Sequence, residues 1–186
     1  MKRTMTKPTL TVSWFPNSIL QCFVRVDFAR VDRRNPGQLF WFEGNEMMKN
    51  PEETIGKLIE KQSISFISSV DEDGYPNTKA MLAPCKREGI KTLYWHTNSP
   101  SLRTKQYRNN PKACVYFCDR RFFRGVMLKG SMEVLDDKKT KKALWEDGYE
   151  KYYTGGPEGG DFIILKFTAE AGRYYSNFNS ESFRIE

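Results

Sequence analysis

Hydroxyl and basic side chains are concentrated in residues 96–105, HTNSPSLRTK, which separate two apolar runs, TLYW and ACVYF. Thr97 and Ser101 flank Pro100, and Arg103 would lie in the first turn of a helix that begins here. Free backbone N–H groups at a helix N-terminus bind phosphate well when hydroxyls and a cation accompany them. The same hydroxyls are also ordinary candidates for the N-cap of a structural helix. Spacing alone favours neither interpretation.

The sequence offers little else that could act as a catalyst by itself. His96 is the only histidine, so a histidine-based metal site or a Ser-His-Asp triad lacks the residues that it needs. A lone histidine at a strand end is more often a structural hydrogen-bonding group. The chain has neither a Gly-rich dinucleotide fingerprint nor a P-loop. We therefore expect no metal site, and we expect that any chemistry is supplied by a bound cofactor.

The composition indicates one globular domain. The chain has 186 residues, of which 39% are hydrophobic and 14% aromatic. A formal charge of +7 raises the question of a nucleic-acid partner. Residues 1–46 alone carry a surplus of three basic residues, and the remainder is only mildly basic. Nucleic acid is therefore not favoured as a partner.

The sequence also indicates a cytoplasmic protein without a membrane partner. No apolar run is long enough to span a bilayer, and the N-terminal region lacks the continuous apolar segment of a signal peptide. The four cysteines, Cys22, Cys85, Cys114 and Cys118, are too few and too scattered for a disulfide framework. Cys114 and Cys118 would lie ~13 Å apart on one face of a strand, too far for a bridge. We expect reduced, buried thiols.

The organisation of the chain changes near residue 47. Residues 1–46 show no clean periodicity, and Met47 or Met48 is a plausible natural start. We expect residues 1–46 to be a disordered leader or extension, with an ordered arm as the alternative, and residues 47–186 to be the folded domain. Asn50 and Pro51 then give the N-cap and first position of a helix that ends near Lys61.

The rest of the chain reads mainly as strands joined by tight turns. We expect strands at 64–70, 77–84, 90–95, 112–118, 125–135 and 161–168, with Gly130 at a bulge. A short helix should end at the NNP of residues 109–111. Asp136 should cap a late helix, and the side chains of this helix that we expect in the core are Ala143, Leu144, Trp145, Tyr149 and Tyr152. The predicted fold is mainly β with flanking helices, an antiparallel barrel.

Three longer segments of the sequence allow a more specific prediction of the fold. The segments GYPNTKAML, TLYWHTNSPSLRTKQYRNNPKACVYF and GVMLKGSMEVL resemble the pyridoxamine 5′-phosphate oxidase-like family of FMN-binding split barrels, in particular its short general-stress-protein branch. The resemblance covers roughly residues 50–178. It implies an antiparallel split β-barrel, an FMN cofactor and an oxidoreductase activity.

The resemblance assigns the phosphate of FMN to four residues of this chain. Lys79 follows the first hairpin, and Thr97, Ser101 and Arg103 occupy the positions of the family's threonine, serine and lysine. An arginine at position 103 keeps the charge and allows a bidentate phosphate contact. Lys105 points to another face of the helix, so we expect a lesser role for it.

The isoalloxazine ring would lie along Ala80, Met81 and Leu82, largely against backbone groups, with His96 next to it. The family is a homodimer with FMN at the subunit interface, and residues near Arg124 and Tyr175 could approach the flavin from either chain. The resemblance also implies a reduced nicotinamide as the electron donor.

Two departures argue against the vitamin substrate of authentic pyridoxamine phosphate oxidases. The C-terminal residues NSESFRIE lack the Arg-x-His motif of those enzymes, and Gly125 replaces a common glutamine. The alternative to an oxidoreductase is a flavin or haem carrier without turnover, or a stress-response binding protein. A deazaflavin in place of FMN also remains open.

Overall fold

The computed structural model describes residues 30–31, 39–40, 48, 50–99 and 101–186. Strands β1 (Arg30–Val31) and β2 (Leu39–Phe40) pair antiparallel with each other and are described by themselves. The predicted disordered leader, residues 1–46, lies mostly outside the described residues and stays a prediction, as does Cys22.

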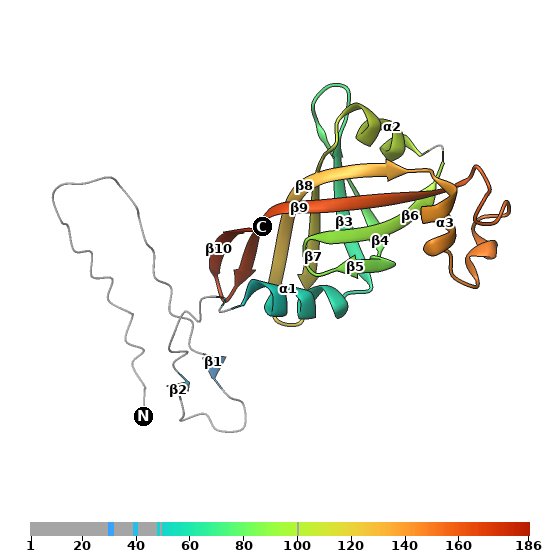
Figure 1. Ribbon diagram of the computed structural model, residues 1–186. Coiled ribbons are helices and arrows are strands. Elements are labelled where there is room, and N and C mark those ends of the chain that lie inside the picture. Colours follow the sequence, from blue (N-terminus) through green and yellow to red (C-terminus); the bar gives the residue numbers. More distant parts are fainter. Residues whose placement is uncertain (1–29, 32–38, 41–47, 49, 100) are drawn as a thin grey trace, which may run out of the picture. The chain divides into compact units, whose positions relative to one another are not determined.

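The folded unit is built on one curved antiparallel sheet of eight strands (Figure 1). Its strands are β3 (Ile64–Val70), β4 (Pro76–Leu82), β5 (Lys86–Glu88), β6 (Thr92–Asn98), β7 (Lys112–Asp119), β8 (Arg124–Leu135), β9 (Phe162–Ser176) and β10 (Asn179–Arg184). The order is β4-β3-β7-β8-β9-β6-β5, and β10 pairs with β9. The predicted antiparallel, mainly β fold with flanking helices is thus confirmed.

Helix α1 (Pro51–Glu60) covers one end of this sheet, as the sequence predicts (Figure 1). The Asn50 side chain accepts a hydrogen bond from the backbone N–H of Glu53 at 3.3 Å. Ile55 and Ile59 are fully or almost fully buried against the sheet. The N-cap and the apolar face of the helix therefore both follow from local sequence.

Strand β9 is the longest strand and organises the barrel. It pairs with β8, β6 and β10. The register of the β8–β9 pair shifts between Lys129 and Gly130, which confirms the predicted bulge. A Cβ atom at Gly130 would collide with the Thr168 carbonyl, so the close approach of the two strands requires glycine.

Several expected boundaries are wrong. The strand expected at 90–95 is β6, Thr92–Asn98, preceded by the short β5. The last predicted strand, 161–168, is too short: β9 continues to Ser176, and a two-residue turn leads into β10. Cys85, Cys114 and Cys118 are free thiols, as expected, but they are half-buried rather than buried. The alternation of inward and outward residues along β7 keeps Cys114 on the outer face.

The late helix is shorter than expected and starts one residue later. Helix α3 spans Lys138–Ala143, and Asp137 rather than Asp136 accepts the capping bond from Thr140 N–H at 2.9 Å. The following residues leave the helix, and only Tyr149–Lys151 form a 3-10 turn. Tyr152 is 66% exposed, whereas Tyr153 is 3% exposed. Leu144, Trp145 and Tyr149 pack half-buried against the cluster of Tyr153 and Phe162, as predicted, whereas Ala143 and Tyr152 are exposed. Tyr153 takes the buried position expected for Tyr152, because the chain changes direction after α3.

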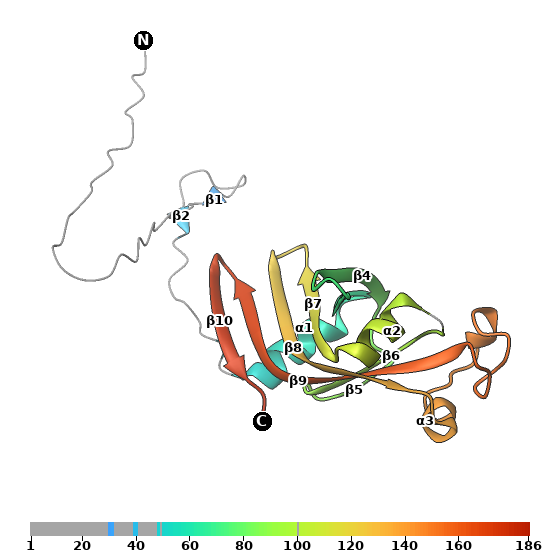
Figure 2. The same cartoon turned by 90° about the horizontal axis from the view of Figure 1, so that it is seen from above.

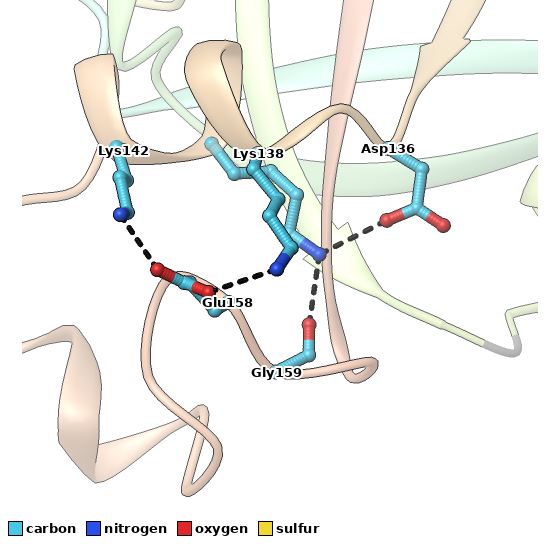
Figure 3. Close-up of polar contacts among 6 residues, drawn as sticks. Asp136, Lys138, Lys142, Glu158 and Gly159 are labelled. Atoms are coloured by element: carbon cyan, nitrogen blue, oxygen red, sulfur yellow. Dashed lines mark hydrogen bonds and ion pairs between the residues drawn. The ribbon is translucent and has the colours of Figure 1, made fainter.

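Ionic contacts fasten α3 to the glycine-rich loop before β9 (Figure 3). The buried ammonium of Lys141 donates to Asp136 at 2.9 Å and to the Gly159 carbonyl at 2.8 Å. Glu158 accepts from Lys138 at 3.1 Å and from Lys142 at 2.6 Å. These contacts fix the segment that carries the aromatic residues. In the described part of the chain, no helix is long and apolar enough to cross a membrane.

Candidate functional site

The stretch HTNSPSLRTK begins on β6 and ends on helix α2 (Leu102–Asn109). Ser101 is the N-cap, since its Oγ accepts a hydrogen bond from Thr104 N–H at 3.3 Å. Thr97 occupies the last inward-facing position of β6. The strand-to-helix junction thus brings Thr97, Ser101 and Arg103 to one end of the barrel.

Arg103 is the most unusual residue at this junction. The residue is 7% exposed, yet no carboxylate pairs with it in the part of the chain that the structure describes. Its Nη2 donates to Thr97 Oγ1 at 3.4 Å, while Nε and Nη1 are buried with no partner among the residues that the structure describes. Burial lowers the pKa of the Arg103 guanidinium. A buried cation with two unused donor atoms is an incomplete arrangement that an anion would complete.

Helix α2 packs on the hairpin formed by β3 and β4. Ser69 at the end of β3 donates to the Gln106 side chain at 2.6 Å in a buried contact. On the surface, Lys105 forms an ion pair with Glu72 of the hairpin turn at 2.7 Å. Figure 1 shows the helix beside the turn of this hairpin. The helix that carries Arg103 therefore packs against β3, the strand that pairs with the strand of Lys79.

The barrel is split between β4 and β6, and Trp95 bridges the split. Its indole N–H lies 3.1 Å from both the Leu82 carbonyl and Ser65 Oγ. From this bridge, both strands run toward α2, one to Lys79 and the other to Thr97. Lys79 is exposed and pairs in register with Ile67, so its side chain starts on the barrel-facing side of β4. Lys79 and the α2 junction thus lie on the same side of the Trp95 bridge.

The three residues expected along the flavin ring alternate across β4. Met81 is half-buried and packs against the core, whereas Ala80 and Leu82 point outward. Leu82 is 64% exposed. An outward-facing ligand would therefore meet the side chains of Ala80 and Leu82 and the backbone of the free edge of β4.

The structure does not bring the His96 side chain together with Thr97 and Arg103. His96 points to the opposite face of β6, where its Nδ1 lies 2.7 Å from the Tyr153 hydroxyl. Its ring centroid is 4.3 Å from that of Tyr149. Burial lowers the pKa of His96 below its ordinary value, so the ring is neutral near pH 7. Only the backbone of His96 adjoins the α2 junction.

One buried group near Arg103 was not predicted. Tyr107 is 2% exposed and its hydroxyl has no hydrogen-bond partner within the described residues. Burial raises the pKa of Tyr107 to about 12, so the phenol stays protonated. Tyr107 is four residues beyond Arg103, so helical periodicity already places the two on one face of α2.

The outer face of β4, β3, β7 and β8 carries a continuous apolar row. Ala80, Phe66, Tyr116 and Met127 are consecutive register partners across the four strands. Phe66 is 40% and Tyr116 39% exposed, and Ile64 beside them is 49% exposed. A sheet face this apolar is typical of a surface that another protein covers.

Arg124 and Tyr175 lie at the far end of this face. Arg124 forms an ion pair with Asp119 at 2.8 Å, and Tyr175 is opposite Gly125. A Cβ atom at Gly125 would collide with the Tyr116 hydroxyl, so Tyr116 fills the space in which a glutamine side chain would begin. Over the residues with described positions, no group of three His, Cys, Asp or Glu side chains could hold a metal ion.

Comparisons with known proteins agree with this geometry. The sequence profile of the pyridoxamine 5′-phosphate oxidase family matches residues 51–176. A pyridoxine/pyridoxamine 5′-phosphate oxidase of Christiangramia forsetii is 26% identical over 103 residues, which are 55% of this chain and 43% of that protein. The match thus spans less than half the length of this curated relative.

Solved structures extend the likeness to the whole folded unit. A Clostridium acetobutylicum protein related to general stress protein 26 is 38% identical, with a TM-score of 0.67 over 73% of this chain and 94% of that chain. An FMN-binding protein of Nostoc punctiforme is 11% identical, with a TM-score of 0.60 over 75% and 98%. A heme-binding protein of Mycobacterium smegmatis is 13% identical, with a TM-score of 0.60 over 74% and 59%. The last two show the fold alone.

Proposed function

Since the chain belongs to the pyridoxamine 5′-phosphate oxidase family, we propose that it is an FMN-binding flavoprotein that acts as an oxidoreductase on a small molecule. One observation carries the proposal. The guanidinium of Arg103 is buried beside Thr97 with two donor atoms unused and with no acidic partner among the described residues. The phosphate of FMN is an anion that fits this donor set.

Four residues would hold the phosphate. Arg103 would offer its two unused donor atoms, Nε and Nη1, Thr97 and Ser101 would offer hydroxyls, and Lys79 would approach from β4. Planar guanidinium groups bind phosphate bidentately, and the first turn of α2 adds backbone N–H groups. The buried position of Arg103 strengthens each of these contacts because little water competes for them.

The ring would lie on the outer side of β4, against Ala80, Leu82 and the backbone around Met81, with the His96 backbone at its edge. FMN supplies the electron transfer when it is bound. The residues of this chain bind the phosphate, orient the ring and exclude water from one side of it. A reduced nicotinamide is the electron donor that we propose.

We further propose a homodimer in which the outer apolar face of β4, β3 and β7 is the subunit interface and the flavin lies at its margin. Ala80 is part of the same row as Phe66 and Tyr116, so burial of the row by a second copy would also enclose a ring beside Ala80. Arg124 and Tyr175, at the end of this face, would approach the flavin from either chain. The proposed location is the cytoplasm.

FMN titration of ligand-free protein, followed by quenching of flavin fluorescence, tests the proposal. Arg103→Ala and Lys79→Ala should each weaken FMN binding while changing riboflavin binding little, because each removes only phosphate contacts. Arg108→Ala is the matched control, since Arg108 is exposed on the opposite face of the same helix. Absence of FMN binding by the wild-type protein would refute the proposal, and so would equal losses for FMN and riboflavin.

A binding protein without turnover is the second candidate function. The heme-binding relative has the same fold, and among the described residues at the phosphate site there is no carboxylate or histidine side chain that could serve as a catalytic acid or base. NADPH oxidation by FMN-loaded protein separates the two functions, because a rate equal to that of free FMN indicates a carrier. A haem titration with His96→Ala as the control tests the haem version, since His96 is the only histidine.

A further inference from the structure

Two neighbouring turns at one end of the sheet expose aromatic rings. The β7–β8 turn carries Phe122 and Phe123, which are 56% and 77% exposed, and the β9–β10 turn carries Phe178, which is also 77% exposed. Gly125 and Tyr175 are register partners just inside the two turns, so the turns are adjacent. Figure 2 shows them at the same end of the sheet. We call these three residues the aromatic tips.

The backbone of both turns is held in an unfavourable conformation. Phe123, Asn177 and Phe178 have φ values of 54°, 49° and 62°, and they are the only residues other than glycine with positive φ among those described. Asparagine tolerates this region, but a phenylalanine there costs conformational energy. The two-residue β9–β10 turn reads Asn-Phe where Asn-Gly is the preferred sequence. Strained residues that also expose large apolar rings suggest a surface selected for contact rather than for stability.

The aromatic tips are surrounded by positive charge. Residues 119–124, DRRFFR, contain three arginines and one aspartate, and that aspartate is paired with Arg124. The guanidinium carbons of Arg121 and Arg124 lie 5.3 Å and 4.8 Å from the centre of the Phe122 ring. Arg120 and Arg121 are exposed. Arg121 and Arg124 are thus held beside the Phe122 ring, which is more than half exposed.

We propose that the aromatic tips and Arg120 and Arg121 form a peripheral contact site for an anionic lipid surface. Projecting aromatic rings enter the boundary between headgroups and acyl chains, and arginines beside them pair with anionic headgroups. Such a contact needs no membrane-spanning helix, because only side chains at the tips enter the membrane.

The shape of the tips favours a lipid surface over the other candidate partners. Single-stranded nucleic acid needs a basic groove that follows its backbone, and the tips are convex ends of two hairpins. A second copy of the chain has the apolar face of β4, β3 and β7 available, which is a flat surface rather than two projecting turns. The proposal does not depend on flavin binding.

Co-sedimentation of the full chain with vesicles tests the proposal. Vesicles of mixed phosphatidylglycerol and phosphatidylcholine should bind the protein, and pure phosphatidylcholine vesicles should not. Arg120→Ser with Arg121→Ser should weaken binding by about fivefold for each arginine. Phe123→Asn with Phe178→Asn should weaken it by at least about tenfold. Both asparagines suit a positive φ, so this variant should fold at least as well as the wild type.

Tyr75→Ser is the matched control, because Tyr75 is 69% exposed on the β3–β4 turn at the opposite end of the barrel. It should bind vesicles as the wild type does. Lack of binding to anionic vesicles at low salt would overturn the proposal, as would an equal loss in the Tyr75 variant. Conversion of a dimer to a monomer by Phe123→Asn with Phe178→Asn would assign the tips to a second copy instead. The proposal would also be overturned if a single-stranded oligonucleotide displaced the protein from vesicles and bound it through Phe123 and Phe178.

Discussion

Replacement of Arg103 by methionine should change stability and cofactor binding in opposite directions. In the ligand-free protein Arg103 is 7% exposed, and among the described residues its guanidinium makes one side-chain hydrogen bond, to Thr97, while Nε and Nη1 have no partner there. Loss of the one bond costs about 1 kcal/mol, and removal of the unpaired buried donors returns about 1–3 kcal/mol. Methionine fills a similar volume. The ligand-free variant should therefore be as stable as the wild type or more stable by up to about 2 kcal/mol, which corresponds to a rise in Tm of up to about 8 °C.

FMN binding should weaken strongly in the same variant. Two charge-assisted hydrogen bonds to the phosphate would be lost, which corresponds to about 2–4 kcal/mol or roughly 30- to 1000-fold in Kd. Riboflavin, which has no phosphate, should bind within about threefold of the wild-type affinity.

Urea denaturation without FMN and fluorescence titration with FMN and riboflavin measure the two effects, with Arg108→Met as the exposed control on the same helix. A ligand-free Arg103→Met protein that is less stable than the wild type by more than about 1 kcal/mol would refute the reasoning. It would mean that the guanidinium is already satisfied without an anion.

Three further predictions concern other parts of the fold. Phe123→Asn should raise the free energy of unfolding by about 0.5–1 kcal/mol, because asparagine tolerates the φ of 54° better than phenylalanine does; urea denaturation measures this. Lys141→Ala should accelerate limited proteolysis of residues 154–160, since it removes the contacts to Asp136 and Gly159; unchanged cleavage would contradict this role. Because burial lowers the pKa of His96, the unfolded chain takes up the proton first, so stability should fall as the pH drops through the window below 6.5. His96→Phe should remove that part of the slope, as urea titrations between about pH 7.5 and 5.5 would reveal.

Local signals in the sequence predict much of this fold. Asn50 and Pro51 define the start of α1, and the strand expected at 64–70 is β3 without any change of boundary. The predicted length of the late helix is wrong. The helical spacing of apolar residues continues beyond Ala143, but the chain turns at Gly148, whose φ is 98°. Helical periodicity does not predict this turn, because the turn depends on the packing of Tyr153 against Phe162 and Ile164 of β9.

The candidate site also combines features that the sequence predicts with features that only the folded structure shows. The junction of Thr97, Ser101 and Arg103 follows from adjacent residues in the sequence. The unpaired state of Arg103 does not, because its burial depends on the packing of α2 against the β3–β4 hairpin through Ser69 and Gln106. The register of β6 determines the face of the strand on which the His96 side chain lies. A one-residue shift would turn its side chain toward the barrel interior.

The connectivity of β9 has a consequence for biosynthesis. Among the described strands, β6 pairs only with the short β5 and with β9, and Trp95 pairs with Leu165, about 70 residues later. At a synthesis rate of 5–20 residues per second, this interval is on the order of 4–14 s. During that time Leu93 and Trp95, both buried in the finished barrel, lack the strand that covers them. The nascent chain is therefore a natural client for ribosome-associated chaperones, and slower translation of the β9 codons should lower the yield of folded protein.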